Sequence, residues 1–98
     1  MRMLFSNAVQ HVGRNVTVRR GVKWSLQFAA EIEGYGELPI TSKVLRFIDL
    51  GPEDIADEHD PACRTYEGLL EVMRRVYPGF DGLELVTVVA YNIDKERA

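Results

Sequence analysis

The sequence predicts an α+β fold, with a small curved sheet or β-barrel and two or three helices at one end. Three observations support this prediction. VTVRR at 16–20 alternates strictly, LELVTVVAYNI at 83–93 is a long apolar run, and TYEGLLEVMRRVY at 65–77 repeats apolar residues every three to four positions. The 98 residues, 46% of them hydrophobic, suffice for one core, so we expect residues 1–98 to form a single domain.

The first expected strand covers 16–20. Its alternation places Val16 and Val18 toward the core and Thr17 and Arg19 on the opposite face, toward solvent or a cleft. Gly21 ends the strand or forms a bulge in it.

The next segment, 25–37, is ambiguous between strand and helical turn. As a strand, LQFAAEIE puts alternate apolar side chains on one face, whereas its alanines and glutamates also suit a helical turn. Two glycines bracket a turn at Tyr35. The residues that would share the apolar face are Leu26, Phe28, Ala30 and Ile32.

Three further segments complete the chain. The run at 38–50 is rich in β-forming residues, with Pro39 near its start or on an edge. GPEDIADEHDP at 51–61 is typical of a short acidic helix that Pro61 closes, and 65–77 is the clearest helix, with Thr65 as its N-cap. The final strand, 83–93, is apolar on both faces, so we expect it to be central and to pair near the first strand.

Charge is distributed unevenly along the chain, which carries a net charge of −3. Residues 1–24 hold five basic and no acidic residues, whereas 25–98 hold seven basic and fifteen acidic residues, a balance of −8. Net acidity argues against broad, non-specific coating of nucleic acid. A local basic face can still hold one phosphate or one short strand, although such runs are often only solvated surface.

Composition also limits the cellular location and the cofactors that we expect for the protein. Cys63 is the single cysteine, so no internal disulfide forms, as is usual in a reducing cytoplasm. No run of about 20 apolar residues is present, and the first residues do not resemble a signal peptide, so we expect a cytoplasmic protein with no membrane partner. EHDPAC at 58–63 lacks the paired spacing of structural zinc sites, so we expect neither a metal nor a cofactor.

Four segments in order resemble the ASCH domain family of the PUA-like superfamily: GRNVTVRRG, EDIADEH, YPGF and LVTVVAYNI, within residues 13–93. The resemblance implies a small β-barrel with flanking helices and a cleft that binds RNA or a nucleoside. Some small bacterial members resemble this chain further. They are amidohydrolases that deacetylate N4-acetylcytidine with a threonine and a lysine from a GRKTxTxR-like segment and a glutamate from an AxxE segment.

Matched residue by residue, the resemblance places Thr17, Arg19 and Glu58 at the family's threonine, arginine and glutamate. The lysine position falls on Arg14 or Asn15, because this sequence is one residue shorter between GR and VTVR. Arginine stays charged at neutral pH and asparagine takes up no proton. Lys23 is the nearest lysine and reaches a cleft only if the chain folds back at Gly21.

These inferences lead to three functional hypotheses. The first is a module that binds RNA or a modified nucleoside in a basic cleft, as a monomer or weak homodimer. The second is an amidohydrolase of N4-acetylcytidine, and the third is a regulatory protein-interaction domain. The candidate catalytic residues are Thr17, Lys23 and Glu58, and the candidate ligand-binding residues are Arg14, Arg19, Arg20, Trp24, Tyr35 and His59.

Overall fold

The structure is a computed structural model that describes residues 2–3, 11–23 and 27–94. Two three-stranded sheets and two α-helices make up this part of the chain, which confirms the α+β prediction. The strands are β1 (Arg2–Met3), β2 (Gly13–Arg20), β3 (Ala29–Ile32), β4 (Gly36–Pro39), β5 (Thr41–Arg46) and β6 (Leu85–Ile93). The helices are α1 (Pro52–Ile55) and α2 (Tyr66–Val76), with 3-10 turns η1 (Phe47–Asp49) and η2 (Pro61–Cys63).

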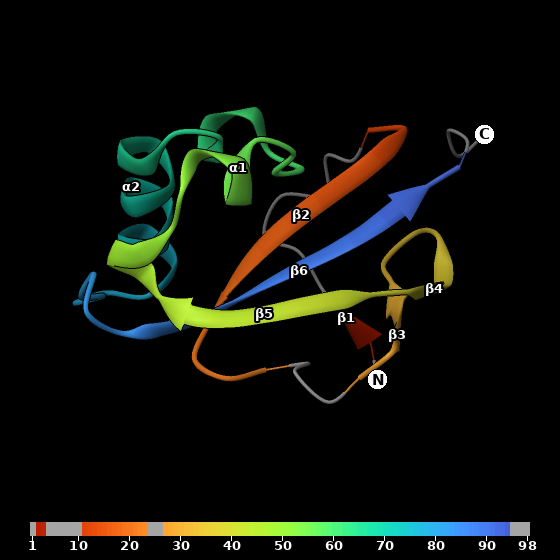
Figure 1. Ribbon diagram of the computed structural model, residues 1–98, viewed down its shortest axis with the longest axis horizontal. Coiled ribbons are helices and arrows are strands. Elements are labelled where there is room, and N and C mark those ends of the chain that lie inside the picture. The colour runs from red at the N-terminus through yellow and green to blue at the C-terminus, as the bar shows by residue number, and fades with distance from the viewer. Residues whose placement is uncertain (1, 4–10, 24–26, 95–98) are drawn as a thin grey trace.

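The long sheet has the order β2-β6-β5, and every neighbouring pair in it is antiparallel. The last strand therefore lies in the centre and pairs with the first long strand, as the sequence predicts. In the small sheet, of order β1-β3-β4, β1 runs parallel to β3 and β4 antiparallel to it. Figure 1 shows both helices at one end of the long strands and the small sheet at the other.

Alternate residues of β6 enter two different cores, because successive side chains of a strand point to opposite faces. Val86, Val88 and Ala90 pack in a cluster with α2 and the 3-10 turns, which we call the helix-side core. Val89, Tyr91 and Ile93 pack with the small sheet in a second cluster, the sheet-side core. The remaining buried members of the sheet-side core are Ala30, Ile32 and Ile40.

The helix at 65–77 is confirmed within one residue at each end. Thr65 caps it, since its hydroxyl accepts a hydrogen bond from the Gly68 amide at 3.1 Å. Leu69 and Met73 are its buried residues. None of the helices in the described segments is long and apolar enough to cross a bilayer.

Three expectations need correction. The run at 38–50 is interrupted at Ile40, which separates β4 from β5, and it ends in the turn η1. The acidic helix at 51–61 stops at Ile55 after four residues, and Pro61 begins η2 rather than closing a helix. In the ambiguous segment β3 forms and buries Ala30 and Ile32 as the strand alternative predicts, but Phe28 precedes the strand and is 88% exposed. Leu26 lies outside the described residues.

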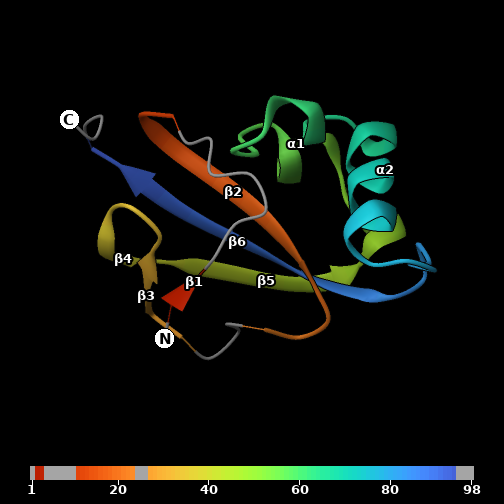
Figure 2. The same ribbon diagram turned by 180° about the vertical axis from the view of Figure 1, so that it is seen from behind.

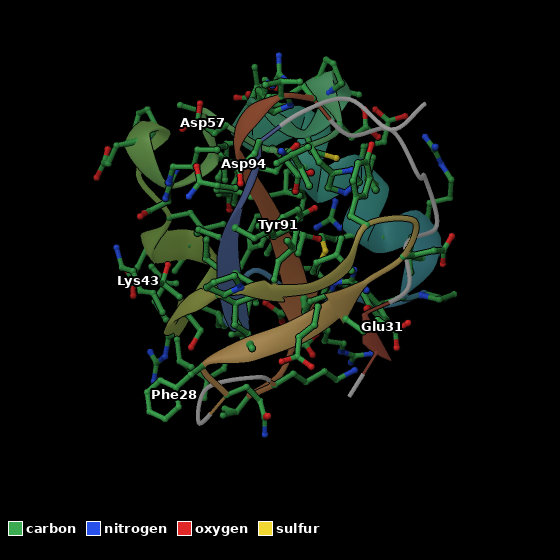
Figure 3. All side chains as sticks on the ribbon, turned by 90° about the vertical axis from the view of Figure 1, so that its right-hand side faces the viewer. Phe28, Glu31, Lys43, Asp57, Tyr91 and Asp94 are labelled. Atoms are coloured by element: carbon green, nitrogen blue, oxygen red, sulfur yellow. The ribbon has the colours of Figure 1, made fainter. Side chains whose placement is uncertain are left out.

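The predicted turn at Tyr35 is present between β3 and β4. Its two glycines have positive φ angles, 88° at Gly34 and 79° at Gly36, which non-glycine residues rarely adopt. Gly21 (φ 80°) likewise follows the last residue of β2. Figure 3 shows Tyr91 in the middle of the molecule, whereas Phe28 and Lys43 point outward.

Candidate functional site

Residues 57–59 lie against the edge of β2 that does not pair with β6. The Val16 amide donates to the Asp57 carbonyl at 2.9 Å, and the His59 amide donates to the Val16 carbonyl at 2.9 Å. These bonds form a short parallel bridge between Val16 and Glu58. Two segments about forty positions apart in sequence thus become neighbours, and they are the segments that carry the predicted threonine, arginine and glutamate.

A cavity of about 160 Å³ opens beside this bridge, between β2, the 58–63 turn and α2. Figure 2, viewed from behind, shows β2 in front with the helices next to it. One side of the cavity is mostly polar and the other is mostly apolar. Among the described residues, Thr17, Val18, Arg19, Glu58, His59, Asp60 and Cys63 line the first side, and Leu69, Val72, Met73, Val76 and Tyr77 line the second.

Four of the predicted site residues therefore border one cavity. Thr17, Glu58 and His59 are buried, with exposed fractions of 4%, 3% and 7%, and Arg19 is partly exposed. Thr17 pairs directly with Val89 of the sheet-side core, so its side chain lies on the face opposite Val16 and Val18, as predicted. Thr17 is buried and is one of the residues that line the cavity.

Glu58 is the most strongly perturbed titratable group among the described residues of the site. Burial raises the pKa of its carboxyl to about 8, against the opposing effects of hydrogen bonds from the Asp60 and Val18 amides and of the Arg19 charge. Its Oε1 accepts from the Asp60 amide at 3.1 Å, and the His59 Nε2 lies 3.3 Å from the same oxygen. At neutral pH this carboxyl is therefore mostly protonated, and it can both donate and accept a hydrogen bond.

Arg19 brings a guanidinium to the cavity. Burial lowers the pKa of Arg19, while Tyr77, Tyr91 and Glu58 act in the opposite direction. The side chain stays charged at neutral pH, because an arginine is not deprotonated in proteins. It is the positive group that faces Glu58 among the lining residues.

The segment EHDPAC forms a closed turn. The Asp60 carboxylate accepts from the Ala62 amide at 3.0 Å, and the Arg64 Nε donates to the Glu58 carbonyl at 3.0 Å. Burial and the nearby Glu58 and Asp60 raise the pKa of the Cys63 thiol to about 12. The thiol thus stays protonated and behaves as a small buried apolar side chain. Its position just before α2 could have lowered its pKa, but burial has the larger effect.

Two of the arginines predicted to bind a ligand, Arg14 and Arg20, do not line the cavity and form ion pairs with acidic residues. Arg14 is exposed and pairs with Asp57 at 2.9 Å. Arg20 pairs with Glu84 at 2.7 Å, and its guanidinium carbon lies 5.7 Å from the centre of the Tyr77 ring. The basic residues of β2 are therefore distributed over different surroundings, and Arg19 is the one that lines the cavity.

The remaining candidates lie elsewhere. Lys23 is exposed and is not part of the cavity lining, although its amide donates to the Thr87 hydroxyl at 2.9 Å. Tyr35 packs against the sheet-side core. Asn15, one of the two residues at the family's lysine position, is fully buried and bonds to the His11 and Gly13 carbonyls. Trp24 lies outside the described residues.

The sequence analysis assigned no site role to the other lining residues, and two of these, Asp60 and Tyr77, carry polar groups that act on Glu58 or Arg19. Tyr77 continues the apolar face of α2, so its spacing alone indicates a core residue. Asp60 carries a signal of its own, since it follows Glu58 and His59 directly in an otherwise unexplained polar run.

Comparison with known proteins adds no relative: no protein-family model matches the chain, and neither a curated protein nor a solved structure matches it. The fold and the cavity define a small α+β domain with a buried polar site.

Proposed function

We propose that this protein is a PUA-like, cytoplasmic module that binds one base of an RNA segment or of a modified nucleoside in the cavity beside β2. The observation that carries the proposal is the convergence of Arg19, Glu58 and His59 on this cavity from two distant segments. The resemblance to the ASCH family assigns two of them, Arg19 and Glu58, to the family's arginine and glutamate. Their common location supports that assignment.

The size of the cavity favours a single ring as the bound group. Its volume is about 160 Å³. Cavities of about 150 Å³ accommodate benzene, whereas pockets for whole drug-sized ligands span roughly 300–1,000 Å³. We therefore expect a base to enter while its sugar stays outside.

The two sides of the cavity suit the chemistry of a base. The α2 side offers Leu69, Met73 and Tyr77 to the apolar faces of a ring. The opposite side offers the Arg19 guanidinium to a carbonyl oxygen and the Glu58 carboxyl to a donor–acceptor edge. A small number of polar groups on a largely apolar surface is typical of sites that fix the orientation of a ligand.

The charge distribution favours a short ligand over a long nucleic acid. Arg14 and Arg20 already pair with acidic residues, so they contribute little to a continuous basic surface. Few phosphate contacts mean a weak dependence of affinity on salt.

The test is the dissociation constant of Arg19→Gln for cytidine, N4-acetylcytidine, uridine and a short single-stranded RNA, measured by calorimetry. Loss of a charge-assisted hydrogen bond costs about 1.5–3 kcal/mol, so we expect affinity for the preferred ligand to fall roughly 10- to 150-fold. Arg14→Gln, an exposed arginine outside the cavity lining, is the matched control and should bind as the wild type does. Equal loss in both variants, or no binding by folded wild-type protein, would refute the proposal.

Hydrolysis of N4-acetylcytidine is the second candidate, because Thr17 and Glu58 border the same cavity. The exposed position of Lys23 leaves this chemistry without the lysine that the resemblance implies.

A further inference from the structure

Tyr77 supplies the only phenol or phenyl ring among the described residues that line the cavity. It follows α2 directly, and both of its backbone groups are hydrogen-bonded. Its amide donates to the Met73 carbonyl at 2.7 Å, and its carbonyl accepts from the Phe80 amide at 3.0 Å. Because Met73 and Phe80 are buried in the helix-side core, the backbone that carries the ring is fixed at the cavity.

The side chain of Arg20 contacts the same ring. Its guanidinium carbon lies 5.7 Å from the ring centre, within the range of a cation–π contact. Arg20 pairs with Val86 of the helix-side core, so its side chain lies on the face of the long sheet that packs against α2. Arg20 does not belong to the described lining of the cavity, so the guanidinium and the cavity contact different sides of the Tyr77 ring.

Glu84 orients the Arg20 guanidinium in turn. Its Oε1 accepts from the Arg20 Nε at 2.7 Å, and its Oε2 accepts from the Asp81 amide at 2.7 Å. The hydrogen bonds from the Asp81 amide and from Arg20 lower the pKa of Glu84, so the carboxylate stays charged at neutral pH. The side chains thus form a chain of contacts that runs from Glu84 through Arg20 to Tyr77 and ends at the cavity.

We propose that Tyr77 is a stacking platform in the cavity, with Arg20 and Glu84 as its positioning residues, and that the site therefore selects a planar, unsaturated ring over a saturated one. This inference rests on the proposed function, because it takes the cavity as the ligand site. It gives Arg20 a role that requires no contact with the ligand. It also sets a requirement on the ligand that hydrogen bonds alone do not impose.

Stacking is the property that separates a flat ring from a puckered one. Arg19 and Glu58 can bond to the carbonyl and N–H groups of either ring, so these polar groups do not distinguish the two. Every base has a π-face that can stack on an aromatic side chain, whereas a saturated ring has none. A phenol ring held in one orientation also loses little conformational freedom when the ligand binds, which favours affinity.

The first test compares uridine with dihydrouridine as ligands of the wild-type protein by calorimetry. The two nucleosides share their carbonyl and N–H groups, but only uridine has a flat, unsaturated ring. We expect uridine to bind about 5- to 150-fold more tightly, which is the contribution of stacking one base on an aromatic side chain. Equal affinities would overturn the inference and leave the binding proposal intact. Absence of binding by cytidine, N4-acetylcytidine, uridine and short RNA alike would refute the binding proposal itself.

Variants identify the residue on which the ring stacks. Tyr77→Leu should lower the affinity for cytidine and uridine by the same factor and remove the preference over dihydrouridine, whereas Tyr77→Phe keeps the ring and the preference. Arg20→Gln should weaken binding about 2- to 5-fold through the lost cation–π contact. Arg14→Gln is the matched control, since Arg14 also pairs with a carboxylate but does not line the cavity, and it should bind as the wild type does.

A spectroscopic readout separates positioning of the ring from support of the fold. Stacking on Tyr77 should move the NMR resonances of the ring protons of bound cytidine upfield, and Tyr77→Leu should abolish this shift. In Arg20→Gln the shift at saturation should be smaller, because the phenol is no longer held in one orientation. A merely structural role of Arg20 would lower affinity without changing the shift of the bound state. The same upfield shift in Tyr77→Leu as in the wild type would overturn the inference, even if cytidine is the only nucleoside that binds.

Discussion

The two cores on either side of β6 differ in what they contain. The sheet-side core consists of six buried apolar or aromatic side chains, including Ile32, Val89 and Tyr91. The helix-side core is larger, and at its border with β2 lies the cavity that Glu58 and His59 line. One strand thus supplies both a purely packed region and the support of a polar site.

The comparison of the two cores shows which features lower the stability of the fold: a buried carboxyl and a cavity. Burial of a charged carboxyl is costly, and the protein meets that cost at Glu58 by raising its pKa until the group is neutral near pH 7. A cavity also forfeits the dispersion contacts that close packing provides. We infer that the sheet-side core contributes mainly to stability, although its Tyr91 acts on Arg19, whereas the helix-side core borders the cavity that we propose as a ligand site.

The largest expected effect is in the sheet-side core. Ile32 is completely buried, so Ile32→Ala should lower the free energy of unfolding by about 2–5 kcal/mol through lost burial and a new cavity. Urea denaturation measures this change. Ile32→Val, expected to cost about 0.5–1.5 kcal/mol, keeps the protein folded enough to test ligand binding.

The matched control is Phe28→Ala, at a residue that is 88% exposed, where a change within about 0.5 kcal/mol is expected. Ligand affinity should be unchanged in Ile32→Val. Weaker binding in that variant would show that the two cores are coupled and would break the comparison.

A smaller effect, with a distinctive pH dependence, is expected at Glu58. Its folded pKa of about 8 lies above its ordinary value of 4.5, so between these values the folded state binds more protons than the unfolded state. Glu58 therefore stabilises the folded state below about pH 4.5, and this stabilisation is lost as the pH rises toward 8. The loss amounts to roughly a few kcal/mol.

Urea denaturation of wild type and Glu58→Gln at pH 5, 7 and 9 measures this contribution. The glutamine does not titrate, so the variant should become more stable relative to the wild type as the pH rises. A constant difference between the two proteins across this range would mean that Glu58 is charged in the folded state and would contradict the contrast between the cores.

Much of the fold could be predicted because its main elements have clear periodicity. Alternation in β2, the apolar spacing of α2 and the two apolar faces of β6 each reflect one physical requirement, burial on one face or on both. The central place of β6 also followed, because a strand that is apolar on both faces must be covered on both, and its expected pairing with β2 is observed.

The sequence predicted several residues of the candidate site, but it did not predict their burial. Glu58 has the composition of a surface helix around it, and the 51–61 segment has acidic residues and a leading proline that favour a helix. The observed helix stops after four residues because the backbone of 57–59 bonds to β2 instead. Such a long-range contact leaves no local signal, so the burial of Glu58 could not be predicted, although its neighbour His59 was expected beside it in a cleft.

The smallest expected effect concerns the helix that forms the apolar side of the cavity. Thr65 caps α2, and Thr65→Ala removes the hydroxyl that satisfies the Gly68 amide, so stability should fall by about 1 kcal/mol. Thr65→Ser retains a hydroxyl and serves as the control. Because α2 packs in the helix-side core, amide hydrogen exchange should quicken in the first turn of α2 and leave β3 and β4 unchanged. Faster exchange in the small sheet as well would mean that the two cores open as one unit. The two cores would then differ in the residues that they contain but not in their local stability.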